Sequence, residues 1–327
     1  MSKKQPGKPS PDEGLAVEQF PTMNQSFYAG DPADYFRRRF HLLMLAAGKT
    51  DEINQLLADG FTFEDIRVDV PVSEPTDDAE RAHAGFITTE AETLLHHASE
   101  ALLRLFFAHA ELPPCPWLEC ARMRLPAAFM NRVRDLCEKP IPKEQIGRVF
   151  LAKVPDGDDP AWSQQVHDLE RFLRFVARRV LDDKTLYNAA KHGLAVLAGP
   201  SSVSITNDQS GASFGASGQS MSFLEVHAAD DNVKTWRLTT RWLSAKDSMW
   251  LTGLVITEMN TLWALARAYY SDVVPDRFEV LTTETVDALM RLGTGSGNAF
   301  TRSSFSLTYC QSPPQADAAG QTTTTGA

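Results

Sequence analysis

The chain has 327 residues, of which 43% are hydrophobic, so it can bury a large core as one large domain or two smaller ones. Its 42 acidic and 32 basic residues give a formal net charge of -10, which disfavours nonspecific attraction to nucleic-acid phosphates but permits a local basic patch. Its four cysteines form no CxxC pair, which favours a reducing compartment over secretion.

The chain carries no sign of export or of a membrane span. Residues 1–14 contain lysines, prolines and acids where a signal peptide needs an apolar segment. The most apolar later segment, 249–270, is interrupted by Glu258, Asn260 and Arg267. We therefore expect a cytoplasmic protein that does not span a membrane.

Both ends of the chain are predicted to be disordered tails. Residues 1–30 are rich in Lys, Pro and Gly, and residues 293–327 are rich in Gly, Ser, Thr and Gln. No long linker divides the residues between them, so we expect one domain over 31–292. Within it, the polar segment 71–85 is predicted to be a mobile loop.

The first helices are predicted from apolar residues that recur at helical spacing. They cover 34–47 and, more briefly, 51–59. Thr89 and Glu92 have the spacing of a capping box, which predicts that the next helix begins at Thr89 and ends at Pro113.

Two prolines mark the following helices. Pro116 fits the first turn of a helix, and Pro126 is expected to break that helix into two halves. Separate helices are then predicted over 161–181 and 183–198, with Gly199-Pro200 as the stop.

The apolar periodicity next changes to that of strands. The predicted strands are 203–206, 221–228 and 233–243. A second capping box, Ser244 with Asp247, starts the last long helix. The expected fold is therefore mainly α, a helical bundle with a small antiparallel β-ribbon or sheet inserted before the last long helix.

The segment 187–193, Tyr-Asn-Ala-Ala-Lys-His-Gly, is the strongest candidate for a functional site. On a helix, Asn188 and His192 lie one turn apart on the same face. A neutral imidazole can transfer a proton near pH 7, and a neighbouring amide can orient it or hold a phosphate oxygen. We assign His192 and Asn188 as candidate catalytic residues, and Tyr187 and Lys191 as candidate ligand contacts. A hydrogen-bonded packing pair is the alternative.

This segment resembles the HEPN superfamily, all-helical domains whose ribonuclease members carry an Arg-x(4 to 6)-His motif. Asn188 occupies the place of the polar residue that often follows the arginine, and His192 that of the histidine. The three permitted arginine positions hold Thr185, Leu186 and Tyr187 instead. The resemblance therefore implies a helical fold and a homodimer, with RNA or a nucleotide as ligand, more than it implies RNA cleavage.

Three arginines one helix earlier could present a cationic strip to a phosphate chain. Arg171, Arg174 and Arg178 recur at three and four residues, opposite the apolar stripe. Glu170 precedes Arg174 by four residues, so a solvated, salt-bridged face is the alternative.

Metal or cofactor binding is not expected. Glu92, His96 and Glu100 lie on one helical face, but no HExxH pattern or matching partner motif completes a metal site. The chain also lacks a GxxxxGK[ST] loop and a GxSxG elbow. Besides the HEPN-like hypothesis, we consider a noncatalytic scaffold that binds a partner protein through the β-ribbon around Phe223 and Trp236.

Overall fold

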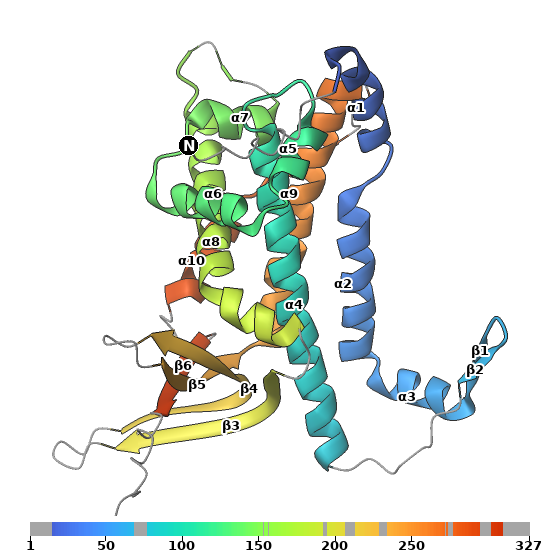
Figure 1. The fold of residues 1–327 in the computed structure, drawn as a ribbon, viewed down its shortest axis with the longest axis vertical. Helices are drawn as coiled ribbons and strands as arrows, with labels where there is room; N and C mark the ends of the chain where they lie inside the picture. The colour runs from blue at the N-terminus through green and yellow to red at the C-terminus, as the bar shows by residue number, and fades with distance from the viewer. Residues whose placement is uncertain are drawn as a thin grey trace, which may run out of the picture.

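The structure is a computed structural model, which describes residues 15–68, 77–152, 154–155, 157–191, 195–206, 213–228, 234–271, 273, 277–294 and 302–309. Three long helices form its centre: α4 (Asp77–His109), α8 (Pro160–Lys191) and α9 (Ala245–Ser271). A small antiparallel sheet lies at one end of α8 (Figure 1). The predicted mainly α fold, with a sheet inserted before the last long helix, is confirmed.

Shorter helices surround the central three: η1 (Val17–Gln19), α1 (Phe20–Tyr28), α2 (Pro32–Gly48), α3 (Thr50–Asp59), α5 (Pro116–Arg122), α6 (Pro126–Glu138), α7 (Lys143–Leu151) and α10 (Thr283–Thr294). A hairpin of β1 (Phe61–Phe63) and β2 (Ile66–Val68) follows α3. Figure 1 shows α5 and α7 at the end of the bundle opposite the sheet, and α2 beside α4.

Local sequence signals fix several helix starts. Asp31 caps α2 by accepting a 2.9 Å hydrogen bond from the Ala33 amide. Pro116 and Pro126 occupy first turns, where the missing N–H costs no hydrogen bond, so the two predicted half-helices are confirmed as α5 and α6. The Ser244 hydroxyl accepts from the Asp247 amide at 3.2 Å and caps α9.

The central helices are stabilised by one contiguous apolar core. α4, α8 and α9 contribute fully buried side chains to it, among them Leu102, Leu103, Leu173, Val176, Met259 and Leu262. Removing such side chains from water is the main source of the stability of helices this long. None of the described helices is long and apolar enough to cross a membrane.

The sheet has the strand order β3 (Val196–Thr206), β4 (Ser213–Ala228), β5 (Lys234–Leu243) and β6 (Arg302–Tyr309), all antiparallel. Its inner face packs Met221, Phe223 and Leu243 against Leu186 of α8. Gly85 allows α4 to approach this sheet, because a Cβ there would lie 3.2 Å from the Ala198 carbonyl oxygen.

The predicted start of α4 is wrong. The helix begins at Asp77, and its acidic first turn complements the positive end of the helix dipole. Residues 77–85 of the predicted mobile loop are therefore helical. Thr89 does not cap the helix, because its hydroxyl donates to the Gly85 carbonyl oxygen one turn earlier at 2.8 Å.

The predicted boundary between two helices near residue 182 is also wrong. α8 continues to Lys191, because Asp183 forms an ion pair with Arg179 one turn earlier instead of ending the helix. Residues 196–200 belong to β3, and Gly199-Pro200 is not a helix stop. Pro200 is tolerated because β3 is an edge strand.

Parts of both predicted tails are ordered elements. Residues 20–28 form α1, which buries Asn24 and Tyr28. Residues 302–309 pair with β5 as β6. Tyr28 is buried in the core and Phe27 packs against it, so a composition rich in Lys, Pro and Gly concealed a few anchoring side chains.

Candidate functional site

The last two turns of α8 present a polar stripe that includes three of the predicted site residues. Lys184, Tyr187, Asn188 and Lys191 recur at i, i+3, i+4 and i+7, so they share one face of the helix. Both lysines and Asn188 are exposed, and Tyr187 is half-buried. We call these four residues the α8 stripe.

Tyr187 connects the α8 stripe to α4. Its ring stacks on the imidazole of His96, with the centroids 4.1 Å apart and the planes 16° apart. The Lys191 ammonium lies 6.0 Å from the centroid of the Tyr187 ring. Among the described residues, neither Lys184 nor Lys191 has a carboxylate partner. The stripe therefore offers two cations on either side of an aromatic ring and an amide, and both cations also interact electrostatically with Glu100 of α4.

An ion pair between α2 and α4 and a histidine of α4 lie beside the stripe. Arg39 of α2 lies 3.5 Å from Nδ1 of His97 and 3.4 Å from the Glu90 carboxylate. Burial lowers the pKa of His97, and the positive charges of Arg39, Lys191 and Arg104 lower it further. Burial and nearby positive charge therefore both favour the neutral form of His97.

His96 is a second neutral histidine at this position. It is only 5% exposed, and burial lowers its pKa to about 4. Its Nε2 lies 3.9 Å from Glu100, and its Nδ1 has no hydrogen-bond partner among the described residues. The sequence placed His96 and Tyr187 in separate groups, and only the packing of α4 on α8 joins them.

A buried ion network lies next to this contact. Arg179 donates to Glu92 at 2.8 Å and approaches Asp183 at 3.2 Å. Arg241 of β5 donates to the same Asp183, and the Ser248 hydroxyl donates to Glu92. The network ties α4, α8, α9 and the sheet together and fixes the last turns of α8 in place.

The remaining residues of the predicted site have different positions. His192 lies outside the described residues. Arg171 binds Asp168 and Asp287, and Arg174 binds Glu170 and the carbonyl oxygens of Cys137 and Lys139. Arg178 is exposed on α8. The arginines do not form a free cationic strip, because two of the three hold other parts of the fold.

The Glu92–His96–Glu100 row does not converge on a metal site in the part of the chain that the structure describes. No group of three or more His, Cys, Asp or Glu side chains there could hold a metal ion. Glu92 was expected to cap a helix, but it is the partner of Arg179 instead.

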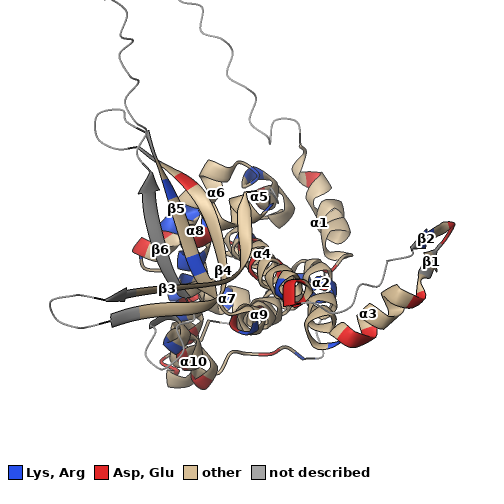
Figure 2. Ribbon diagram, turned by 90° about the horizontal axis from the view of Figure 1, so that it is seen from below, with Lys and Arg blue, Asp and Glu red and all other residues tan. Residues whose placement is uncertain are grey.

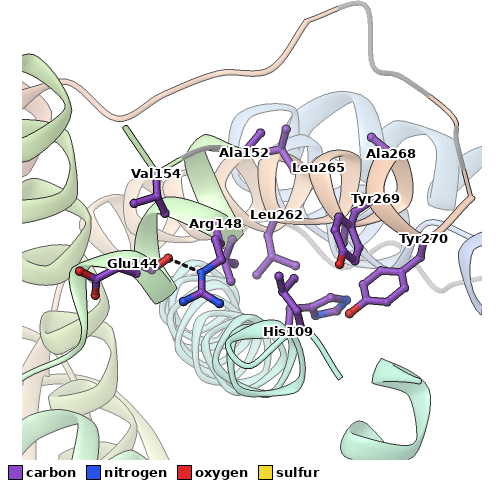
Figure 3. A pocket seen from close by; sticks show the side chains of 13 residues that line it. His109, Glu144, Arg148, Ala152, Val154, Leu262, Leu265, Ala268, Tyr269 and Tyr270 are labelled. Atoms are coloured by element: carbon purple, nitrogen blue, oxygen red, sulfur yellow. Dashed lines mark hydrogen bonds between the residues drawn. The ribbon is translucent and has the colours of Figure 1, made fainter. Parts of the chain in front are cut away.

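A cavity of about 720 Å³, which the sequence did not suggest, lies between the end of α4, α7 and α9. Figure 3 shows its lining, to which α9 contributes Leu262, Leu265 and Ala268, and α7 contributes Arg148. The residues come from segments more than 100 positions apart in the sequence. No periodicity within one helix could have revealed them.

One end of this cavity is a buried, neutral polar cluster. Nδ1 of His109 lies 2.6 Å from the Leu105 carbonyl oxygen, which can only accept, so Nδ1 carries the proton. Nε2 then accepts from the Tyr28 hydroxyl at 2.7 Å. Burial lowers the pKa of His109 to about 4. The Tyr270 hydroxyl donates to the Pro113 carbonyl oxygen at 2.8 Å.

The outer face of the sheet is apolar. Leu197 is 75% exposed, Leu224 55%, and Val226 and Trp236 49% each. Cross-strand register places Val226 opposite Trp236. Trp236 therefore lies on the surface that the scaffold hypothesis requires, whereas Phe223 is buried on the inner face because side chains alternate along a strand.

Comparison of the chain with protein-family models, with curated protein sequences and with solved structures finds no match. The function of this chain therefore has to be inferred from its own geometry.

Proposed function

We propose that this helical protein binds single-stranded RNA or a nucleotide at the α8 stripe. The observation that supports the proposal is that Lys184 and Lys191, without carboxylate partners among the described residues, lie on either side of Tyr187 and Asn188. Cations recognise phosphates, and an aromatic ring with a neighbouring amide is suited to a base.

The overall negative charge does not argue against this site. Some of the acidic residues, among them Asp51 and Glu52, lie on α3, which Figure 2 shows away from α8 and the sheet. The proposed ligand site has Arg39 and the two lysines beside it, and these three cations outnumber the nearby carboxylates of Glu90 and Glu100. Because few cations take part, we expect binding to be weak, with a small slope of log affinity against log salt.

In the HEPN-like form of this proposal, His192 and Asn188 face the bound phosphate, and a second copy of the chain completes the site. An apolar stripe on α2 supports self-association close to the α8 stripe: Tyr35, Leu42 and Leu45 are all more than half exposed. Cleavage of RNA is the optional part of the proposal, since the motif arginine is absent.

The test is the salt dependence of binding to a fluorescein-labelled ten-nucleotide oligouridylate, measured by anisotropy. Replacing both Lys184 and Lys191 by Gln removes two phosphate contacts, so we expect the slope of log affinity against log salt to fall by about 1.4. The matched control replaces the exposed Lys143 and Lys246 by Gln and leaves the slope unchanged. His192→Ala is expected to weaken binding or abolish cleavage.

An unchanged slope in the Lys184/Lys191 variant would remove the proposed site. An equal fall of the slope in the Lys143/Lys246 variant would show that the chain attracts the oligonucleotide nonspecifically.

The outer face of the sheet supports a second candidate function, capture of a partner protein that has an apolar surface. Exposed apolar patches of this kind are typical of interaction sites. The test is the recovery of one co-purifying protein with the native chain but not with Trp236→Ser. The control is Leu56→Ser, which removes an equally exposed apolar side chain from α3.

A further inference from the structure

The cavity between α4, α7 and α9 has the size and lining of a small-molecule site. Its volume of about 720 Å³ lies within the range of about 300–1,000 Å³ that is usual for ligand pockets. Its walls are mainly aliphatic, with Val149 contributed by α7 and Leu262 and Leu265 by α9. Such walls favour an apolar molecular body.

The polar groups of His109 and Tyr270 in the lining already have partners. His109 donates to Leu105 and accepts from Tyr28, and Tyr270 donates to Pro113. They form a neutral surface that does not require a charged ligand. The part of a ligand that rests against them is therefore expected to be uncharged.

Arg148 is the one cation among the described lining residues. Its Nε donates to the Glu144 carbonyl oxygen at 3.2 Å, and Figure 3 shows its side chain among the residues that line the cavity. It forms no ion pair with a described residue, and it is exposed. An arginine of this kind is suited to a carboxylate, which it can bind through two parallel hydrogen bonds.

Glu144 is the only acid in the described lining, and it does not neutralise Arg148. Figure 3 shows its carboxylate directed away from the cavity, and no ion pair joins the two side chains. The cavity therefore combines an apolar interior with one available positive charge at its edge.

From this combination we infer that the cavity binds a small amphipathic monocarboxylate, with its hydrocarbon chain between α7 and α9 and its carboxylate on Arg148. The inference is independent of the α8 stripe, with which the cavity shares no lining residue.

The experiment compares decanoate with 1-decanol, which has the same chain length and no charge, by isothermal titration calorimetry on the full chain. We expect decanoate to bind at least tenfold more tightly. In Arg148→Gln the two affinities should become equal, because only the charged contact is removed. Arg178→Gln, the same change at an exposed arginine of α8, should keep the tenfold preference.

A cavity-filling variant tests the location of the chain. Ala268→Phe places a ring in the cavity and should weaken both probes at least tenfold, with circular dichroism confirming that the helices are intact. The inference is overturned if the native chain binds the two probes equally or binds neither at 1 mM. It is also overturned if Arg148→Gln retains the preference, or if a folded Ala268→Phe binds like the native chain.

Discussion

Two buried polar clusters in this protein are built in opposite ways. The cluster around Arg179 is charged: it balances Glu92 and Asp183 with Arg179 and Arg241, drawn from α4, α8 and β5. The cluster around His109 is neutral: it joins His109 to Tyr28 by a hydrogen bond without any ion pair. The charged cluster holds the sheet on the bundle, and the neutral one closes a ligand-sized cavity.

The difference predicts how each cluster responds to mutation and to low pH. Removing one member of a buried ion network leaves an uncompensated charge, whereas removing one member of a neutral pair leaves only an unsatisfied hydrogen-bonding atom. The charged cluster should therefore be the more sensitive to mutation and the neutral one the more sensitive to acid.

The largest effect is expected from Arg179→Met, which keeps most of the side-chain volume but leaves Glu92 without its cation. The free energy of unfolding, measured by urea denaturation at pH 7, should fall by about 3–5 kcal/mol. Arg178→Met, one position earlier and exposed, should change it by less than about 0.5 kcal/mol. Similar unfolding free energies for the two variants would mean that the ion network contributes little to the stability of the fold.

The next effect is a pH dependence. The folded pKa of His109 is about 4, below the value of about 6.5 for an unfolded histidine, so the unfolded chain binds more protons between these values. Stability from this group is complete above pH 6.5 and is lost as the pH falls towards 4, by up to about 3 kcal/mol. In His109→Gln, the fall in unfolding free energy over this window should be smaller than in the native chain. An equal fall in the native chain and in His109→Gln would contradict the assignment of this pH dependence to His109.

The smallest effect is expected from Tyr28→Phe, which removes only the hydroxyl that donates to His109. We expect the free energy of unfolding to fall by about 1–2 kcal/mol, because Nε2 of His109 is then buried without a donor. Tyr35→Phe removes a hydroxyl from a ring that is 53% exposed and should have almost no effect. A loss below about 0.5 kcal/mol for Tyr28→Phe would show that water replaces the hydroxyl.

Local signals in the sequence predicted an element correctly where a single residue fixes the local backbone conformation. Pro116 and Pro126 start helices because a first turn needs no N–H donor, and Ser244 starts α9 because its hydroxyl can accept from the following amides. The alternation in 233–243 likewise identified β5. These predictions depend only on neighbours in the chain.

The same signals failed where a distant partner decides. Thr89 has the pattern of a cap, but α4 continues through it because its N-terminal turns pack on the sheet. Asp183 resembles a helix boundary, but Arg179 and Arg241 hold it inside α8. The candidate site was predictable only in part. The spacing of Tyr187, Asn188 and Lys191 along one helix is a local signal, but the stacking of Tyr187 on His96 depends on how α4 packs on α8.

The sequence by itself determined the mainly α class, the sheet inserted before α9 and the polar face at the end of α8, because periodicity and capping act over a few residues. Only the tertiary structure decided that His96 meets Tyr187, that Arg171 and Arg174 are occupied, and that His109, Arg148 and Leu265 enclose a common cavity. Contacts of this kind depend on how helices far apart in the chain pack, and packing is set by the whole core.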